Sequence, residues 1–163
     1  MNNNTYLPKK TYKMVQEAVC IVCVDIVVKT SKGVLLGVRA YDPEMGKRWL
    51  IGGRILFGEK LESAAIRKVR QETGLKVKLE RLIGAYSLVY THVNDKRHNL
   101  AIAFLARQVG GKLKKTSEYS KYEFIKKSDH TLAPYVRKVL ADSRVFMKGG
   151  AKAKVMKIPV FTD

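Results

Sequence analysis

The chain of 163 residues has the length of one ordinary domain, and a hydrophobic content of 46% is enough to form a core without disulfide or zinc crosslinks. Its longest uncharged apolar run, residues 18–24, is far shorter than the roughly 20 residues needed to cross a bilayer, which excludes a transmembrane helix. The 32 Lys and Arg residues against 14 Asp and Glu residues give a net charge of +18, which attracts polyanions such as phosphate-bearing substrates or nucleic acid.

The first residues, 1–11, are polar and then basic and have no apolar segment of the secretory type, so we expect a cytoplasmic protein. Residues 9–16 are predicted to form a short helix or an arm. The chain is accordingly divided into three parts. These are an N-terminal arm or short helix at 1–13, one domain at 14–146 and a basic C-terminal tail at 147–163.

A hairpin is predicted near the start of the domain. Residues 18–29 alternate β-branched and apolar side chains, as a largely buried strand does, and after a turn at 30–33 a second strand follows at 34–39. Cys20 and Cys23 have the spacing of half a zinc site, but no second pair follows them. We therefore predict that both are buried structural thiols.

The clearest helix is predicted over residues 61–73, because Leu61, Ala65 and Val69 fall on one face of it and Gly74 supplies a left-handed end. Three further strands are predicted at residues 77–90, 99–109 and 122–125. A last helix is predicted at 132–141, with Ser128 as its N-cap and Pro134 in its first turn. This order of elements favours an α/β fold in which helices cover a mixed sheet.

A sequence motif covers the loop before the predicted helix and the helix itself. Its defining residues are Gly53, Glu59, Arg67, Val69, Glu72, Gly74 and Leu75. Their spacing resembles the Nudix box, a loop–helix–loop that holds divalent metal against a diphosphate. The resemblance implies the Nudix fold, with a mixed β-sheet sandwiched between helices, and a hydrolase that uses Mg2+, or alternatively Mn2+.

The motif departs from the family at its metal-binding positions. Residues 68, 71 and 72 share one patch of helix surface, where the family places three carboxylates, but here Lys68 and Gln71 replace the first two. Glu72 remains, in the last turn, where the helix dipole disfavours an acid unless a cation compensates. Two interpretations stay open: Glu72 is a metal ligand, or it forms a surface salt bridge with Lys68 or Lys76.

The box also carries residues whose family role is structural first. In the family, the residues matching Arg67 and Glu59 tie the loop to the helix and take only an indirect part in catalysis. The carbonyl that matches Gly53 is a metal ligand in the family, so the resemblance implies a metal site made of Gly53, Glu72 and Glu118.

The likeness extends beyond the box, over roughly residues 7–146, to the GDP-mannose mannosyl hydrolases, whose box is also depleted and which cleave a sugar C–O bond. It implies that Asp25 contacts the sugar and that Arg39 contacts the diphosphate. Arg54 and Lys68 are assigned to the substrate as further cations, and Arg39 joins Glu72 and Arg67 as a residue of the catalytic site. Read without the family, Asp25 merely ends a strand and Arg39 is a solvated cation.

The general base is left unassigned. Where the mannosyl hydrolases carry a Gln-His pair, metal ligand and base, this chain has Glu118 and Tyr119, and a phenol with a pKa near 10 is a poor base. The only imidazoles are His92, His98 and His130, each of which is more typical of a surface or turn residue.

Three functions follow from these observations. The first is a Mg2+-dependent hydrolase of a nucleotide sugar of the GDP-mannose type, and the second is a general Nudix diphosphatase acting on a nucleotide or on a substrate of the ADP-ribose type. The third is a catalytically degenerate domain that binds nucleotide or RNA through its positive charge. The family analogy adds a homodimer, and no membrane partner is expected.

Overall fold

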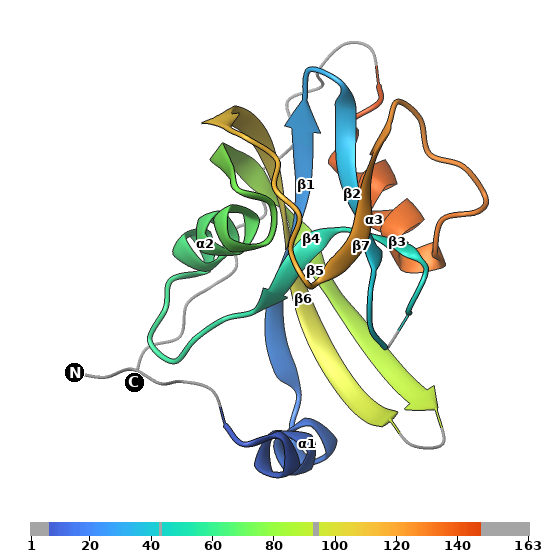
Figure 1. Cartoon of the computed structure of the whole chain (residues 1–163). Coiled ribbons are helices and arrows are strands. Elements are labelled where there is room, and N and C mark those ends of the chain that lie inside the picture. The colour runs from blue at the N-terminus through green and yellow to red at the C-terminus, as the bar shows by residue number, and fades with distance from the viewer. Residues whose placement is uncertain (1–6, 43, 93–94, 148–163) are drawn as a thin grey trace.

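The computed structural model describes residues 7–42, 44–92 and 95–147, and in these residues seven strands form one sheet with helices on both faces (Figure 1). The strands are β1 (Ile21–Thr30), β2 (Gly33–Arg39), β3 (Arg48–Trp49), β4 (Ile51–Arg54), β5 (Leu75–His92), β6 (Asp95–Gly111) and β7 (Tyr119–Ile125). The helices are α1 (Lys9–Ala18), α2 (Leu61–Thr73) and α3 (Pro134–Ser143). The predicted α/β architecture is confirmed.

The sheet is mixed and centres on β1. The strand order is β3-β2-β1-β6-β5, with β4 paired to β1 and β7 paired to β2. β1 runs parallel to β6 and antiparallel to β2 and β4, so the predicted β1–β2 hairpin is confirmed. Because β6 occupies one edge of β1, β2 and β4 share the other edge. That arrangement places Gly52 opposite Asp25 and Gly53 opposite Val24.

Two apolar cores lie on the two faces of the sheet. Alternate β1 side chains point to opposite faces, so Val24 and Ile26 pack in the core that includes Val69 of α2, while Val27 packs in the core that includes Val139 of α3. All five are fully buried, and each such side chain stabilises the fold by roughly 1.5 to 3 kcal/mol. The buried strand that the sequence predicted is therefore present, and it separates α2 from α3.

Helix α2 has the predicted bounds, and its end positions the motif. Gly74 is left-handed, with φ 76°, and its N–H donates to the Arg70 carbonyl at 3.0 Å. Ala64, Ala65 and Val69 form the buried face. Glu72 is therefore held one turn after Lys68 in the last turn of the helix, one residue before its end at Thr73.

One predicted feature of the last helix differs from the structure. The N-cap of α3 is Ala133, without a side-chain hydrogen bond, so the prediction of Ser128 as the cap is wrong. In the turn before the helix, the Asp129 carboxylate accepts hydrogen bonds from the Thr131 backbone N–H at 2.9 Å and from Arg48 at 3.0 Å. Helix α1 crosses the expected boundary between residues 13 and 14. The tail beyond residue 147, and residues 1–6 of the arm at 1–13, lie outside the described residues.

The prediction that both cysteines are buried is wrong for Cys20 and holds only in part for Cys23. Cys20 is exposed, because it lies between α1 and β1 rather than within the strand. Cys23 is half-buried, and burial, reinforced by the nearby Asp25 carboxylate, raises its thiol pKa to about 12, so it stays neutral.

Among the described residues, no group of three or more His, Cys, Asp and Glu side chains is placed to hold a metal ion. In the same residues, no helix is both long and apolar enough to span a membrane.

Candidate active site

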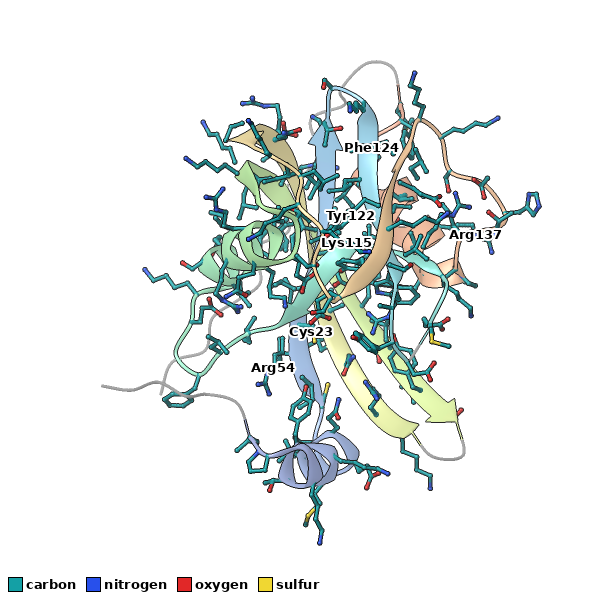
Figure 2. All side chains as sticks on the ribbon, in the orientation of Figure 1. Cys23, Arg54, Lys115, Tyr122, Phe124 and Arg137 are labelled. Atoms are coloured by element: carbon teal, nitrogen blue, oxygen red, sulfur yellow. The ribbon has the colours of Figure 1, made fainter. Side chains whose placement is uncertain are left out.

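A cleft of about 90 Å³ lies where β1, β2 and β4 meet, and it brings together three predicted site residues: Asp25, Arg39 and Gly53. Cys23 marks this region in Figure 2. The other polar side chains of its wall come from β5, β6 and β7; they are Tyr90, Arg97, Asn99 and Tyr119. A more voluminous hollow of about 650 Å³ is formed by residues around Lys29 and Arg107, but no acid lines it. The smaller cleft is the better candidate because a buried acid, Asp25, and the cations Arg39 and Arg97 converge there.

Asp25 lies in this cleft with only 7% of its surface exposed. Tyr135 of α3 donates its hydroxyl to Asp25 Oδ2 at 2.5 Å. A Cβ on Gly52 would lie 2.1 Å from Asp25 Oδ1, so any other residue at position 52 would clash with the Asp25 carboxylate. Burial raises the Asp25 pKa to about 6, against the hydrogen bond from Tyr135, which lowers it. Nearby Glu72 raises it further, and the cations Arg39 and Lys68 lower it.

We expect Asp25→Asn to stabilise the protein at pH 8 and to have little effect on stability near pH 4. The folded-state pKa of about 6 exceeds the ordinary 3.8, so ionisation destabilises the folded state increasingly as pH rises between those values. The full difference is about 3 kcal/mol and is present above pH 7. Urea unfolding of both proteins at pH 4 and pH 8 measures it. An equal difference in unfolding free energy at both pH values would contradict a buried, titrating Asp25.

Glu72 is 4% exposed, and every one of its carboxylate and carbonyl oxygens has a partner. Lys68 forms an ion pair with Oε1, and the Tyr119 hydroxyl donates to Oε2 at 2.8 Å. The hydroxyls of Tyr122 and Thr116 donate to its backbone carbonyl. Burial raises the Glu72 pKa, and the charge of Lys68 opposes that rise. The expected pair with Lys68 is thus present, but it is buried rather than on the surface.

Tyr119 has a different role from the base whose position it takes in the family pattern. It is 4% exposed, and burial next to Glu72 raises its pKa well above the ordinary value, so the hydroxyl keeps its proton and donates a hydrogen bond to Glu72. Its ring covers Gly37, where a Cβ would lie 2.2 Å from the ring. Tyr119 therefore acts as a positioning residue for the carboxylate.

The loop before α2 is tied to the helix by one ion pair. Arg67 donates from Nε to Glu59 Oε1 and from a terminal nitrogen to Glu59 Oε2, both at 2.6 Å. Arg67 also donates to the Arg54 carbonyl at 3.3 Å, and Glu59 Oε2 accepts the backbone N–H of Leu56 at 3.0 Å. Two-point pairing of a planar guanidinium fixes orientation as well as distance. These contacts hold β4, and hence Gly53, against α2.

The remaining oxygen donors fit one Mg2+ ion but not several. Mg2+ is usually held by one or two carboxylates, with water and substrate phosphate completing its shell. Glu72 supplies one carboxylate, Gly53 supplies a backbone without a side chain, and Glu118 is an exposed acid close enough to raise the Glu72 pKa. Lys68 and Gln71 add no anionic oxygen. The donor chemistry is therefore that of a single-ion site.

The structure does not bring every predicted substrate cation into the cleft. Arg39, at the end of β2, lies over the Trp49 ring at 6.0 Å and lines the cleft. Arg54 instead lies over the ring of Tyr12 in α1 at 4.6 Å, and Figure 2 shows it directed toward that helix. Lys68 is engaged by Glu72.

The imidazoles do not provide a base in the described part of the site. His98 is exposed and lies 2.8 Å from the Ser87 hydroxyl, and His130 is exposed in the turn before α3. Neither lines the cleft. The side chain of His92 lies outside the described residues.

Sequence reasoning missed several polar residues of the site. Tyr135, which holds Asp25, is 110 positions away in the chain, and Tyr90, Arg97 and Asn99 come from strands whose patterns show only a sheet. No local motif marks any of them. Glu118 and Tyr119 were found only through the family pattern.

Comparison with known proteins identifies what the chain is similar to. The family model of the NUDIX domain matches residues 21–143. The Low-salt glycan biosynthesis protein Agl8 of Haloferax volcanii is 29% identical over 140 residues, which are 83% of this chain and 90% of that protein. An ADP-ribose pyrophosphatase of Methanocaldococcus jannaschii is 35% identical over 104 residues, 63% of this chain and 60% of that protein. The crystal structure of a MutT protein from Methanosarcina mazei matches with a TM-score of 0.65 and 24% identity, over 76% of this chain and 93% of that one.

Proposed function

The chain belongs to the NUDIX domain family, and from this premise we propose that it is a Mg2+-dependent hydrolase of a nucleoside diphosphate linked to a sugar. The observation that carries the proposal is the cleft, where a buried acid, Asp25, and a cation, Arg39, line the same space. The Gly53 backbone and Tyr119, which donates to Glu72, line this cleft as well. A nucleotide sugar presents hydroxyl groups, which donate hydrogen bonds to a carboxylate. It also presents phosphate oxygens, which accept two parallel hydrogen bonds from a guanidinium.

In this proposal Glu72, the Gly53 carbonyl and Glu118 would hold the metal, which would supply neutralisation of the diphosphate oxygens when bound. Arg39 orients the diphosphate, and Asp25 accepts hydrogen bonds from the sugar. Tyr119 keeps Glu72 in place by donating a hydrogen bond to Oε2. The Glu59–Arg67 pair holds the loop that carries Gly53, so that Arg67 contributes indirectly.

The choice of sugar nucleotide rests on the likeness to the GDP-mannose mannosyl hydrolases, and the relative named for glycan biosynthesis supports a sugar-containing substrate. The second candidate is a general diphosphatase, which the likeness to an ADP-ribose pyrophosphatase favours. The two differ in the bond that breaks: a sugar C–O bond in the first and a phosphate P–O bond in the second. A cytoplasmic location and a homodimer remain predictions of the sequence.

A panel of GDP-mannose, other nucleoside diphosphate sugars and ADP-ribose, incubated with Mg2+ or Mn2+ in oxygen-18 water, tests the proposal. We expect hydrolysis of a nucleotide sugar, with the label in the released sugar for C–O cleavage. Label in a phosphate selects the general diphosphatase. Absence of turnover with every substrate, together with RNA binding that falls steeply with salt, would replace both with the binding domain.

We expect Arg39→Ala to raise KM for the diphosphate substrate by roughly tenfold or more, because a charge-assisted contact to phosphate is lost. The fold is expected to remain intact, since Arg39 lies at a strand end and at the cleft wall. The matched control is Arg137→Ala, which removes an exposed cation from α3. Steady-state kinetics of the two variants measure the effect. If Arg39→Ala and Arg137→Ala have the same KM, Arg39 does not contact the substrate.

A further inference from the structure

The side chain of Lys68 lies against two of the three groups that are proposed to hold the metal, Glu72 and Gly53. Its Nζ forms the ion pair with Glu72 Oε1. Its Cε and Nζ also lie 2.5 and 2.8 Å from the point that a Cβ on Gly53 would occupy. Gly53 has φ +153°, and because it has no side chain the lysine can pack directly against the backbone. The Lys68 ammonium therefore lies against both the Glu72 carboxylate and the backbone at Gly53.

The position of this ammonium is built into helix α2. Lys68 and Glu72 are four residues apart, so their side chains meet on one face of the helix. The pair is well shielded, with 17% of the Lys68 side chain and 5% of the Glu72 side chain exposed. An ion pair shielded to this degree is screened little by salt. The contact is therefore a persistent property of the site.

Both oxygens of the Glu72 carboxylate are engaged in the structure. Oε2 accepts a hydrogen bond from Tyr119, whose ring is buried, whereas Oε1 is paired with the long, flexible side chain of Lys68. A divalent ion that binds Glu72 at Oε1 meets the positive charge of Lys68 at close range. Lys68 is thus the partner that has to be displaced.

We propose that Lys68 is a resident cation of this site that competes with a divalent ion for Glu72. The inference deepens the proposed function and rests on it for the identity of Glu72 as a metal ligand. It assigns to Lys68 a role toward the carboxylate, in addition to the substrate contact expected from the sequence. Position 68, which supplies an anionic metal ligand in other family members, thus carries a lysine here that weakens the binding of a divalent ion.

The experiment is a titration with Mn2+ alone, without nucleotide, followed by electron paramagnetic resonance and by calorimetry at one pH and ionic strength. Lys68→Met removes the charge but keeps a long side chain, and we expect it to bind Mn2+ roughly tenfold more tightly than the parent protein, or better. Lys78→Met removes an exposed cation from β5 and is expected to leave the affinity unchanged. Glu72→Gln added to Lys68→Met is expected to abolish the gain.

A second variant covers the case in which Lys68→Met unfolds because it leaves Glu72 without its cation. Lys68→Glu restores the carboxylate of the family pattern, and we expect Mn2+ to raise its Tm, relative to EDTA, by more than it raises that of the parent protein. Equal Mn2+ affinity and equal Tm shifts in all variants would overturn the competition. The proposed hydrolase activity is measured separately: tighter Mn2+ binding without turnover of any nucleotide sugar would keep this inference and refute the proposed function.

Discussion

Glu72→Gln is expected to lower turnover of the nucleotide-sugar substrate by roughly 100-fold or more and to remove most of the Mg2+ affinity. The substitution keeps the size of the side chain and its ability to accept from Tyr119, but it removes the charge that holds a hard cation. Charge neutralisation by a metal is worth several kcal/mol in the transition state, which corresponds to at least that loss of rate. Activity measured against Mg2+ concentration gives both quantities.

The turnover of the same variant separates the two interpretations of Glu72, because its stability responds to both. Burial raises the pKa of Glu72, which favours a neutral side chain, but the substitution also leaves the shielded Lys68 ammonium without its anion, so the Tm in EDTA is expected to fall. Glu62→Gln makes the same change on an exposed residue in the first turn of α2 and is the control. Near-normal turnover with a lowered Tm would identify a structural salt bridge and favour the binding domain.

Arg67→Ala is expected to reduce both stability and activity. The Arg67 and Glu59 side chains are 21% and 14% exposed, and removal of one partner leaves a shielded carboxylate without its two-point donor. The loss of unfolding free energy is expected to be roughly 2 to 3 kcal/mol, somewhat below the value for a fully buried pair. Because the loop that carries Gly53 is released, activity is expected to fall by roughly 100-fold, a loss that displacements of about 1 Å produce.

Urea unfolding and steady-state kinetics of Arg67→Ala decide between an indirect and a direct role. The control is Arg70→Ala, an exposed residue of the same helix that donates to the Gly74 carbonyl. Arg67→Lys is expected to recover little, because an ammonium cannot reproduce the two parallel hydrogen bonds. Full stability combined with lost activity would instead show that Arg67 acts on the substrate.

The sequence by itself determined the features that depend on neighbours along the chain. Helix α2 ends where Gly74 adopts its left-handed conformation, and the i, i+4 spacing brings Lys68 against Glu72. The alternation of apolar residues likewise determined the buried strand β1. Local rules suffice in these cases, because helix periodicity, strand alternation and glycine stereochemistry act over a few residues. They do not extend to the short strands β3 and β4, whose pairing with distant β2 and β1 creates them.

Only the tertiary structure decided the environment of the site. Tyr119 reaches Glu72 across 47 positions of sequence and Tyr135 reaches Asp25 across 110, so both carboxyl groups are enclosed by residues from remote parts of the chain. This burial raises the pKa of both acids, against the hydrogen bonds from the two tyrosines, which lower it. Arg54, although it lies in the motif, is directed to Tyr12 of α1 rather than to the cleft. The physical reason is that burial and charge depend on all atoms near a group, and folding brings most of those atoms from remote parts of the chain.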